Sequence, residues 1–393
     1  MLKPWALGGS DRPHHALPLG GGCWRAPAPE GAATAELLGR WGWRHLGELP
    51  DGAGRWQALE GPAAEVPPRL DAATAAELDP EADRAAWILA RLTAGRAAMA
   101  APLSAPRLMA ILNLSPDSFS DGAGTAPAAF GEGTMALLDK AQCLQAEGAD
   151  RLDLGAESTR PGARPVPAEE QLARLLPAIE ALAPVGLPLS VDTRDAEVAR
   201  RCLEAGADMV NDVSGLADPG MAPLLAATGA PAVLMHLRGT PEDMQERTGY
   251  RHLLGEVADE LMVSVARAGA AGVDPARLIL DPGIGFAKDA VQSRELVARG
   301  GALRALGLPL LFGPSRKSFM ADTLPGKRPD QRDAGTAGAA ALCAAQGASW
   351  LRLHRGGRSW DAVKVAAAAA RAAHEAADRD LPAPPAPRPE QPA

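Results

Sequence analysis

Eight short apolar runs, each closed or followed by a polar residue, constrain the fold of this chain of 393 residues more than any other feature. The polar residues are Asn113, Asp153, Asp192, Asn211, His236, Asp281, Ser315, Arg352 and His354. Strands that stay apolar until their last residue are typical of a parallel sheet buried on both faces. The pattern therefore predicts that polar side chains gather at the C-terminal edge of such a sheet.

The apolar runs predict eight strands separated by helices. The strands span residues 108–113, 151–154, 188–192, 209–212, 232–235, 278–281, 309–312 and 350–353. Between most of them lie Ala- and Leu-rich stretches with charged residues at helical spacing. Because this alternation extends over roughly the 250 residues usual for such a barrel, it predicts an α/β fold, a (β/α)8 TIM barrel.

A weak internal repeat supports this count. Four tetrapeptides, at 147–150, 205–208, 228–231 and 346–349, carry glycine second and precede a predicted strand. Glycine at this place is typical of a helix C-cap. Five residues beyond the glycine lie Asp153, Asn211 and Arg352 in three of the repeats, so we expect these polar groups at one recurring structural position.

Composition narrows the class of protein. The formal net charge of −8 argues against a nucleic-acid or anionic-membrane partner, and 47% hydrophobic residues suffice for a large core. The four cysteines, without CxxC spacing, are expected to be reduced thiols rather than metal ligands or disulfides. No apolar run reaches the roughly 18 residues of a membrane span, and the start lacks a signal-peptide pattern. We therefore expect a soluble, cytoplasmic protein.

Texture divides the chain into three parts. Residues 1–105 form an N-terminal extension of unknown fold, with six of the eight tryptophans and a helix-like stretch at 71–99. Its tryptophans are expected to serve packing, with ligand binding as the alternative. Residues 106–375 form the predicted barrel, and the Pro-rich tail at 376–393 is predicted to be disordered.

Two loop sequences carry a resemblance to a known family. Residues 111–122 read ILNLSPDSFSDG and residues 153–163 read DLGAESTRPGA. Taken singly, Asn113 is a common turn residue and Arg160 a common solvated cation. Together the two strings resemble the signatures of dihydropteroate synthase, an enzyme family of folate biosynthesis.

Further matching strings occur in the same order as the predicted strands. They lie at 190–193, 211–215, 235–241, 281–286, 313–318 and 352–354, so that the resemblance covers residues 106–373. The resemblance implies a TIM barrel and a transferase, in which p-aminobenzoate displaces pyrophosphate from 6-hydroxymethyl-7,8-dihydropterin pyrophosphate to give 7,8-dihydropteroate. It also implies a homodimer.

The resemblance assigns the pterin to four residues. A pterin presents an edge of N–H donors and a carbonyl, and it therefore needs carboxylates, an amide and a cation. Asp192, Asn211, Asp281 and Lys317 supply that set. The alternative for Asp192 and Asp281 is that each caps the helix after its strand.

The resemblance divides the remaining positions between pyrophosphate, metal and p-aminobenzoate. It implies Thr159, Arg160, Arg352 and His354 for pyrophosphate, Asn113 for Mg²⁺, and Phe119, Pro161, Phe286 and Ser315 for p-aminobenzoate. Asp121, Arg160, Asp192, Asp281 and Lys317 are the implied catalytic residues, with Asp121 and Thr159 ordering the loops. The alternatives are an N-cap role for Ser315 and structural roles for His354 and, more strongly, His236.

The chain departs from the family pattern in a few places. Arg355 and Gly356 follow His354, where the family usually has Asp, and Arg355 either adds charge at the phosphate end or faces solvent. Ala287 replaces a common Gly and Ser115 replaces Thr. Two alternative functions are a non-catalytic pterin-binding paralogue and a methyltetrahydrofolate–corrinoid methyltransferase.

Overall fold

The computed structural model describes the strands β1 (Leu17–Gly20), β2 (Cys23–Pro27), β3 (Arg44–Glu48) and β4 (Trp56–Glu60), then Met99 and residues 103–114, 132–158 and 162–380. The first four strands pair antiparallel in the order β1-β2-β4-β3, within the predicted N-terminal extension. The helix expected at 71–99 lies outside the described residues except for helical Met99.

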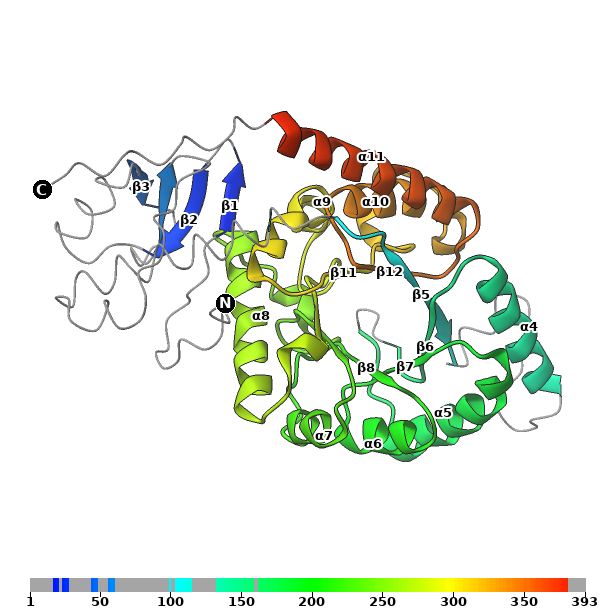
Figure 1. Ribbon diagram of the computed structural model, residues 1–393. Coiled ribbons are helices and arrows are strands. Elements are labelled where there is room, and N and C mark those ends of the chain that lie inside the picture. Colours follow the sequence, from blue (N-terminus) through cyan, green and yellow to red (C-terminus); the bar gives the residue numbers. More distant parts are fainter. Residues whose placement is uncertain are drawn as a thin grey trace, which may run out of the picture.

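The larger sheet is parallel and closes on itself (Figure 1). Its strands are β5 (Arg107–Asn113), β6 (Arg151–Gly155), β7 (Leu189–Asp192), β8 (Met209–Asp212), β9 (Ala232–Met235), β10 (Leu278–Asp281), β11 (Leu311–Phe312) and β12 (Trp350–Leu353). Their order is β10-β9-β8-β7-β6-β5-β12-β11, and a parallel bridge between Leu280 and Leu310 joins the two edges. The predicted TIM barrel is confirmed, and the predicted bounds of β8, β9, β10 and β12 match the structure.

Helices surround this barrel (Figure 1). They are α4 (Glu132–Ala146), α5 (Ala168–Leu182), α6 (Ala196–Glu204), α7 (Met221–Thr228), α8 (Leu253–Ala270), α9 (Ala290–Arg299), α10 (Asp333–Ala345) and α11 (Arg358–Asp380). Short 3₁₀ turns are η2 (Ala183–Val185), η3 (Met244–Glu246), η4 (Pro275–Arg277), η5 (Gly300–Leu306), η6 (Ser318–Met320) and η7 (Pro329–Gln331). No helix among the described residues is both long and apolar enough to span a membrane.

Helix α11 continues beyond the predicted start of the C-terminal tail. We expected disorder from residue 376, whereas the helix ends at Asp380, and residues 381–393 lie outside the described part. The alanine-rich sequence before the prolines explains the difference, because alanine has the highest intrinsic helix propensity.

Side chains alternate between the two faces of each strand, so the barrel has one apolar core outside the sheet and one inside it. Residues facing outward pack against the helices in one large cluster of buried apolar side chains. Inside the barrel lies a smaller cluster of Met109, Met209, Val233, Ile279, Leu311 and Trp350. Asn211, Asp281 and Arg352 each come two residues after a member of this inner cluster, so they face the interior one layer nearer the C-terminal mouth.

The glycines of the internal repeat are helix ends, as predicted. Gly148, Gly206, Gly229 and Gly347 all adopt left-handed backbone conformations, with φ between +66° and +117°. An alanine is unfavourable in this conformation because its Cβ approaches the following carbonyl oxygen. The repeat therefore records a shared way of ending a helix before a barrel strand.

Three cysteines in the described part of the chain are free thiols. Cys143, Cys202 and Cys343 are free thiols on α4, α6 and α10, and the latter two are buried. Burial raises the pKa of the Cys202 thiol to about 12, chiefly through desolvation of the thiolate. Cys202 and Cys343 therefore act as small apolar core groups.

Replacing Gly148 tests how much the repeat contributes to stability. A Cβ at Gly148 would lie 3.0 Å from Cδ1 of Trp360, whereas a Cβ at Gly229 would meet no atom within 4 Å. We expect Gly229→Ala to cost about 1–2 kcal/mol from the backbone conformation alone. Gly148→Ala should cost more, and about 2–4 °C of Tm is lost per kcal/mol. Thermal unfolding followed by circular dichroism measures the difference, and equal losses would contradict the role of Trp360.

Candidate active site

The predicted polar residues converge at the C-terminal mouth of the barrel. The parallel register aligns Gly155 with Asp192 and Asp192 with Asn211, which brings the ends of β6, β7 and β8 together. Asp192, Asn211 and Asp281 are buried, and Arg352 is largely buried. The predicted gathering of polar side chains at the C-terminal edge of the sheet is therefore confirmed.

A buried carboxylate organises this cluster. One oxygen of Asp153, Oδ2, accepts hydrogen bonds from Nδ2 of Asn211 at 3.0 Å and from Nε of Arg352 at 2.6 Å. These are the three residues that follow the repeated glycines by five positions. Arg352 also donates from Nη2 to Oδ2 of Asp192 at 2.7 Å. One guanidinium thus pairs with two carboxylates, and residues that share one position in the repeat are in direct contact.

Asp192 is held in an unfavourable environment for its charge. The pKa of Asp192 is raised to about 7, chiefly by burial; Arg352 opposes this increase, and the neighbouring Asp153 adds to it. The helix-cap alternative is wrong for this residue, because the N-cap of α6 is Asp195. Asp192 is therefore a buried acceptor near its titration point, which is a common property of functional carboxylates.

Asp281 and Lys317 form the second charged group of the mouth. Burial raises the pKa of Asp281, whereas the nearby Lys317 lowers it. Burial lowers the pKa of Lys317 to about 8, and Asp281 opposes this change. Oδ1 of Asp281 accepts from the N–H of Gly283 at 2.8 Å, and the N-cap of α9 is Asp289, so the helix-cap alternative is wrong here too.

The ammonium of Lys317 lies against the loop that follows β10. Its Nζ donates to the carbonyl of Ile284 at 2.5 Å and lies 4.5 Å from the ring centroid of Phe286. A cation over an aromatic face is attracted by the negative potential of the ring. The loop therefore positions Lys317 and brings the predicted pterin lysine beside Phe286, which the sequence assigned to p-aminobenzoate.

Arg316, between two predicted site residues, has an unusual backbone conformation. Its φ is +58°, in the left-handed region that non-glycine residues rarely adopt. Its guanidinium binds Asp333 through two hydrogen bonds, at 2.7 and 3.0 Å, and its N–H donates to Thr336. These contacts to α10 hold the turn that carries Ser315 and Lys317.

Ser315 binds His354 instead of capping a helix. Its hydroxyl accepts from the N–H of His354 at 3.2 Å and lies 2.9 Å from Nδ1 of that ring. The helix-cap alternative for Ser315 is wrong, because η6 begins after Lys317 and has no side-chain cap. Ser315 therefore joins the residues predicted for p-aminobenzoate to those predicted for pyrophosphate.

Asn113 lies at the end of β5, beside the chain of β6. A Cβ placed on Gly155 would lie 3.4 Å from Oδ1 of Asn113 and 3.7 Å from Oδ2 of Asp192. Across the described residues there is no group of three or more His, Cys, Asp or Glu that could hold a metal. Mg²⁺ bound with phosphate usually keeps several waters and takes one or two protein ligands. The lone Asn113 amide fits such an ion, one that takes most of its ligands from pyrophosphate and water.

Five predicted site residues lie outside the described part of the chain: Phe119, Asp121, Thr159, Arg160 and Pro161.

The structure also shows the contacts of Arg355, which departs from the family pattern. Arg355 is exposed and pairs with Glu147, in the connection between α4 and β6. Glu147 also accepts from the N–H of Gly356 at 2.8 Å. Arg355 therefore anchors the chain after β12 instead of standing free in solvent.

Sequence reasoning gave His236 a structural role and missed its partner. His236 is buried and hydrogen-bonds Lys288 and Glu260. Lys288 is almost completely buried and was not singled out. Its position in the matched loop, two residues after Phe286, was the available signal. Asp153 was noted as a strand-end residue, yet its central contact with Arg352 became visible only in three dimensions.

Comparisons with known proteins agree with this geometry. Residues 109–354 match the family described as pterin binding enzyme. The dihydropteroate synthase of Synechocystis sp. is 44% identical over 251 residues, which cover 63% of this chain and 84% of that protein.

Solved structures with pteroic acid or 7,8-dihydropteroate as ligand are similar to this chain in fold. A Clostridium difficile dihydropteroate synthase, solved in the presence of pteroic acid, is 35% identical with a TM-score of 0.63, and the match covers 69% of this chain and 99% of that one. A Burkholderia cenocepacia dihydropteroate synthase complexed with 7,8-dihydropteroate is also 35% identical, with a TM-score of 0.60 and coverage of 69% and 93%. The fold, the order of the site residues and these matches together show that this chain belongs to the dihydropteroate synthase family of pterin-binding enzymes.

Proposed function

We propose that this chain condenses 6-hydroxymethyl-7,8-dihydropterin pyrophosphate with p-aminobenzoate to give 7,8-dihydropteroate and pyrophosphate. The observation that carries the proposal is the convergence of Asp192, Asn211, Asp281 and Lys317 at one mouth of the barrel. Two buried carboxylates, an amide and an ammonium complement the donor edge and the carbonyl of a pterin. The names of the family relatives point to the same reaction.

The pterin is held by charge and hydrogen bonds at the strand ends. Asp281 accepts from the guanidine-like edge, and Lys317 donates to the ring carbonyl or to N5. Asn211, oriented by Asp153, supplies the amide. Because the Asp153 carboxylate already holds the amide and Arg352, these groups meet the ligand with little rearrangement.

The leaving group requires positive charge. Arg352 and His354 lie on β12 and directly after it, and with Arg160 they form the proposed clamp for pyrophosphate. Asn113 would hold Mg²⁺, which neutralises charge that develops on pyrophosphate when it leaves. The C–O bond to pyrophosphate breaks with both electrons, and the amine nitrogen forms the new C–N bond and then loses a proton. Asp192 and Asp281 favour the cation-like methylene electrostatically.

The second substrate binds beside the pterin. Phe286 and Pro161 would pack against the p-aminobenzoate ring with Phe119, and Ser315 would face its carboxylate. Asp121 and Thr159 order the loops, which keeps water from a cation that water would also trap. Since Ser315 contacts His354, the sites proposed for p-aminobenzoate and for pyrophosphate meet at this pair.

The proposal extends to assembly and location. We infer a homodimer from the family resemblance and a cytoplasmic location from the composition of the chain. The departure from the family pattern at Arg355 is one argument for the non-catalytic alternative. This argument is weakened, because Arg355 is held by Glu147.

Turnover distinguishes the enzyme from a pterin-binding paralogue. We expect pyrophosphate release from the pterin substrate with Mg²⁺ to depend on p-aminobenzoate, and a sulfonamide to inhibit competitively against p-aminobenzoate because it mimics that substrate. Phosphate detection after pyrophosphatase treatment measures the rate. Pterin binding without turnover that depends on p-aminobenzoate would instead establish the paralogue.

Three substitutions separate the pterin and pyrophosphate roles. Asp281→Ala and Lys317→Ala should weaken pterin binding about 30-fold or more, since losing one partner of a buried charged contact costs about 2–5 kcal/mol. Arg160→Ala should chiefly lower turnover and p-aminobenzoate capture. Isothermal titration with 6-hydroxymethylpterin measures binding, and comparable losses in all three variants would refute this division.

The pH dependence of kcat/KM for the pterin substrate should be bell-shaped. Asp192 carries the negative charge that favours the cation-like methylene only when it is ionised. Its pKa is raised to about 7, so activity rises through that pH. Lys317 loses its charge above its lowered pKa of about 8, so activity falls there. Lys317→Arg is the matched control, because arginine stays charged and should abolish the alkaline limb. A flat profile between about pH 6 and 9 would argue against both assignments.

A further inference from the structure

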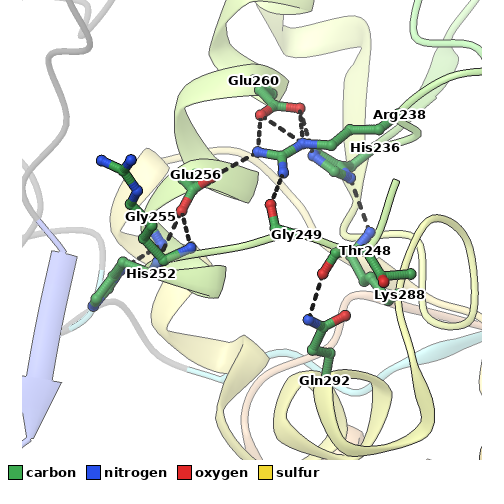
Figure 2. A network of polar contacts seen from close by, with 11 residues as sticks. His236, Arg238, Thr248, Gly249, His252, Gly255, Glu256, Glu260, Lys288 and Gln292 are labelled. Carbon is green, nitrogen blue, oxygen red and sulfur yellow. Dashed lines mark hydrogen bonds and ion pairs between the residues drawn. The ribbon is translucent and has the colours of Figure 1, made fainter. Parts of the chain in front are cut away.

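Lys288 lies behind the proposed pterin site with its charge fully enclosed. It sits between β10 and α9, one residue before the helix cap Asp289, and only 2% of it is exposed. Its Nζ lies 2.9 Å from Nδ1 of His236 (Figure 2) and 2.8 Å from the carbonyl of Phe286. A buried amine without a contact to the proposed substrates needs another role, because its burial is costly.

The surrounding contacts fix the direction of each hydrogen bond. Burial lowers the pKa of His236 to about 4, so its ring is neutral at physiological pH. Nε2 of His236 lies 3.0 Å from Oε2 of Glu260, an ionised acceptor whose own pKa is lowered to about 2 by His236 and Arg238 against its burial. Nε2 therefore carries the ring proton, and Nδ1 accepts from Lys288. Burial lowers the pKa of Lys288 to about 7, and both forms of the amine keep N–H donors.

The far end of this chain of bonds is anchored to α8. Arg238 donates from Nε to both oxygens of Glu260, at 3.0 and 3.1 Å, and from Nη2 to Glu256 at 2.8 Å. Its guanidinium also stacks over Tyr250, 3.9 Å from the ring centroid. Figure 2 shows the row of contacts running from Glu260 through His236 to Lys288. The lysine is thus linked to the outer helix α8 through His236 and Glu260.

At the other end of this row of contacts, Lys288 forms a hydrogen bond across a strained residue, Ala287. Between Phe286 and Lys288 lies Ala287, fully buried, with φ of +50°. Alanine is unfavourable in this region, so surrounding contacts must hold it there. The bond from Lys288 to the Phe286 carbonyl spans Ala287 and holds this turn. The same loop offers the Ile284 carbonyl and the Phe286 ring to Lys317.

We propose that Lys288 is a positioning residue for pterin recognition: through its bonds to His236 and the Phe286 carbonyl, it holds the β10–α9 loop in the conformation that directs Lys317 toward the pterin. The inference rests on the proposed function, because it assigns Lys317 to the pterin. Lys288 acts through the loop, and its charge also lowers the pKa of the neighbouring Asp281.

Pterin affinity and thermal stability, measured separately, test the proposal. The variants of the full chain are Lys288→Met, Lys288→Met with Ala287→Gly, and Asp289→Ala as a control. Asp289→Ala removes the adjacent helix cap, which accepts from Gln292 at 2.8 Å, without touching the lysine network. Dissociation constants for 6-hydroxymethylpterin come from isothermal titration, and Tm from circular dichroism.

A positioning role predicts that affinity and stability separate. Lys288→Met should weaken pterin binding on the order of tenfold, the usual size of losing a buried hydrogen bond to a charged group. Ala287→Gly should recover Tm in that background by relieving the strained backbone. Pterin binding should stay weak, because glycine supplies neither of the bonds by which Lys288 fixes the loop. Asp289→Ala should lower Tm while pterin affinity stays within about twofold, since surface caps affect mainly stability.

Other outcomes overturn the proposal in distinguishable ways. Unchanged affinity in Lys288→Met, or affinity that returns together with Tm in the double variant, would show a merely structural lysine. Absence of pterin binding in the unmodified protein would instead refute the proposed function. If Lys288→Met does not fold, His236→Leu replaces it: this variant removes the acceptor of Lys288 and should weaken pterin binding severalfold, and unchanged affinity would again refute the role.

Discussion

The buried Asp153 carboxylate is the interaction on which the barrel mouth depends. It holds Arg352 and Asn211, and Arg352 in turn holds Asp192, so the ends of β6, β7, β8 and β12 share one electrostatic network. Ions buried this deeply are stable only when paired, and removing one partner of a buried pair typically costs about 3–5 kcal/mol. The network therefore makes the geometry of the mouth a condition of folding, and not only of binding.

In the free protein, burial disfavours the charged forms of Asp192 and Lys317 at this site. The raised pKa of Asp192 and the lowered pKa of Lys317 both record charges that burial disfavours. A pterin supplies hydrogen-bond partners to such groups and so relieves part of that cost. Stability is commonly sacrificed in this way at sites that must recognise charge. Under the proposed function, the burial that perturbs these pKa values also suits Asp192 and Lys317 to a pterin.

How much the sequence predicts depends on whether a residue obeys a periodic rule. Asp153, Asn211 and Arg352 follow a repeated glycine at a fixed distance, so their common structural position is predictable, as are the strands that carry them. Their mutual contacts depend on barrel closure, which joins residues 199 positions apart in the case of Asp153 and Arg352. The pairing of Arg355 with Glu147 is equally nonlocal, and no pattern in either segment announces it.

Two strained turns explain why the lysine end of the site was hardest to predict. Arg316 and Ala287 both adopt left-handed conformations without being glycine, and each adjoins a residue proposed to face a substrate. Groups outside the site help to hold both turns: Asp333 on α10 binds the first, and Lys288 with His236 holds the second. Because the cost of each strained turn is offset by contacts outside the mouth, the position of Lys317 depends on the outer helices as well as on the strand ends that the sequence pattern marks.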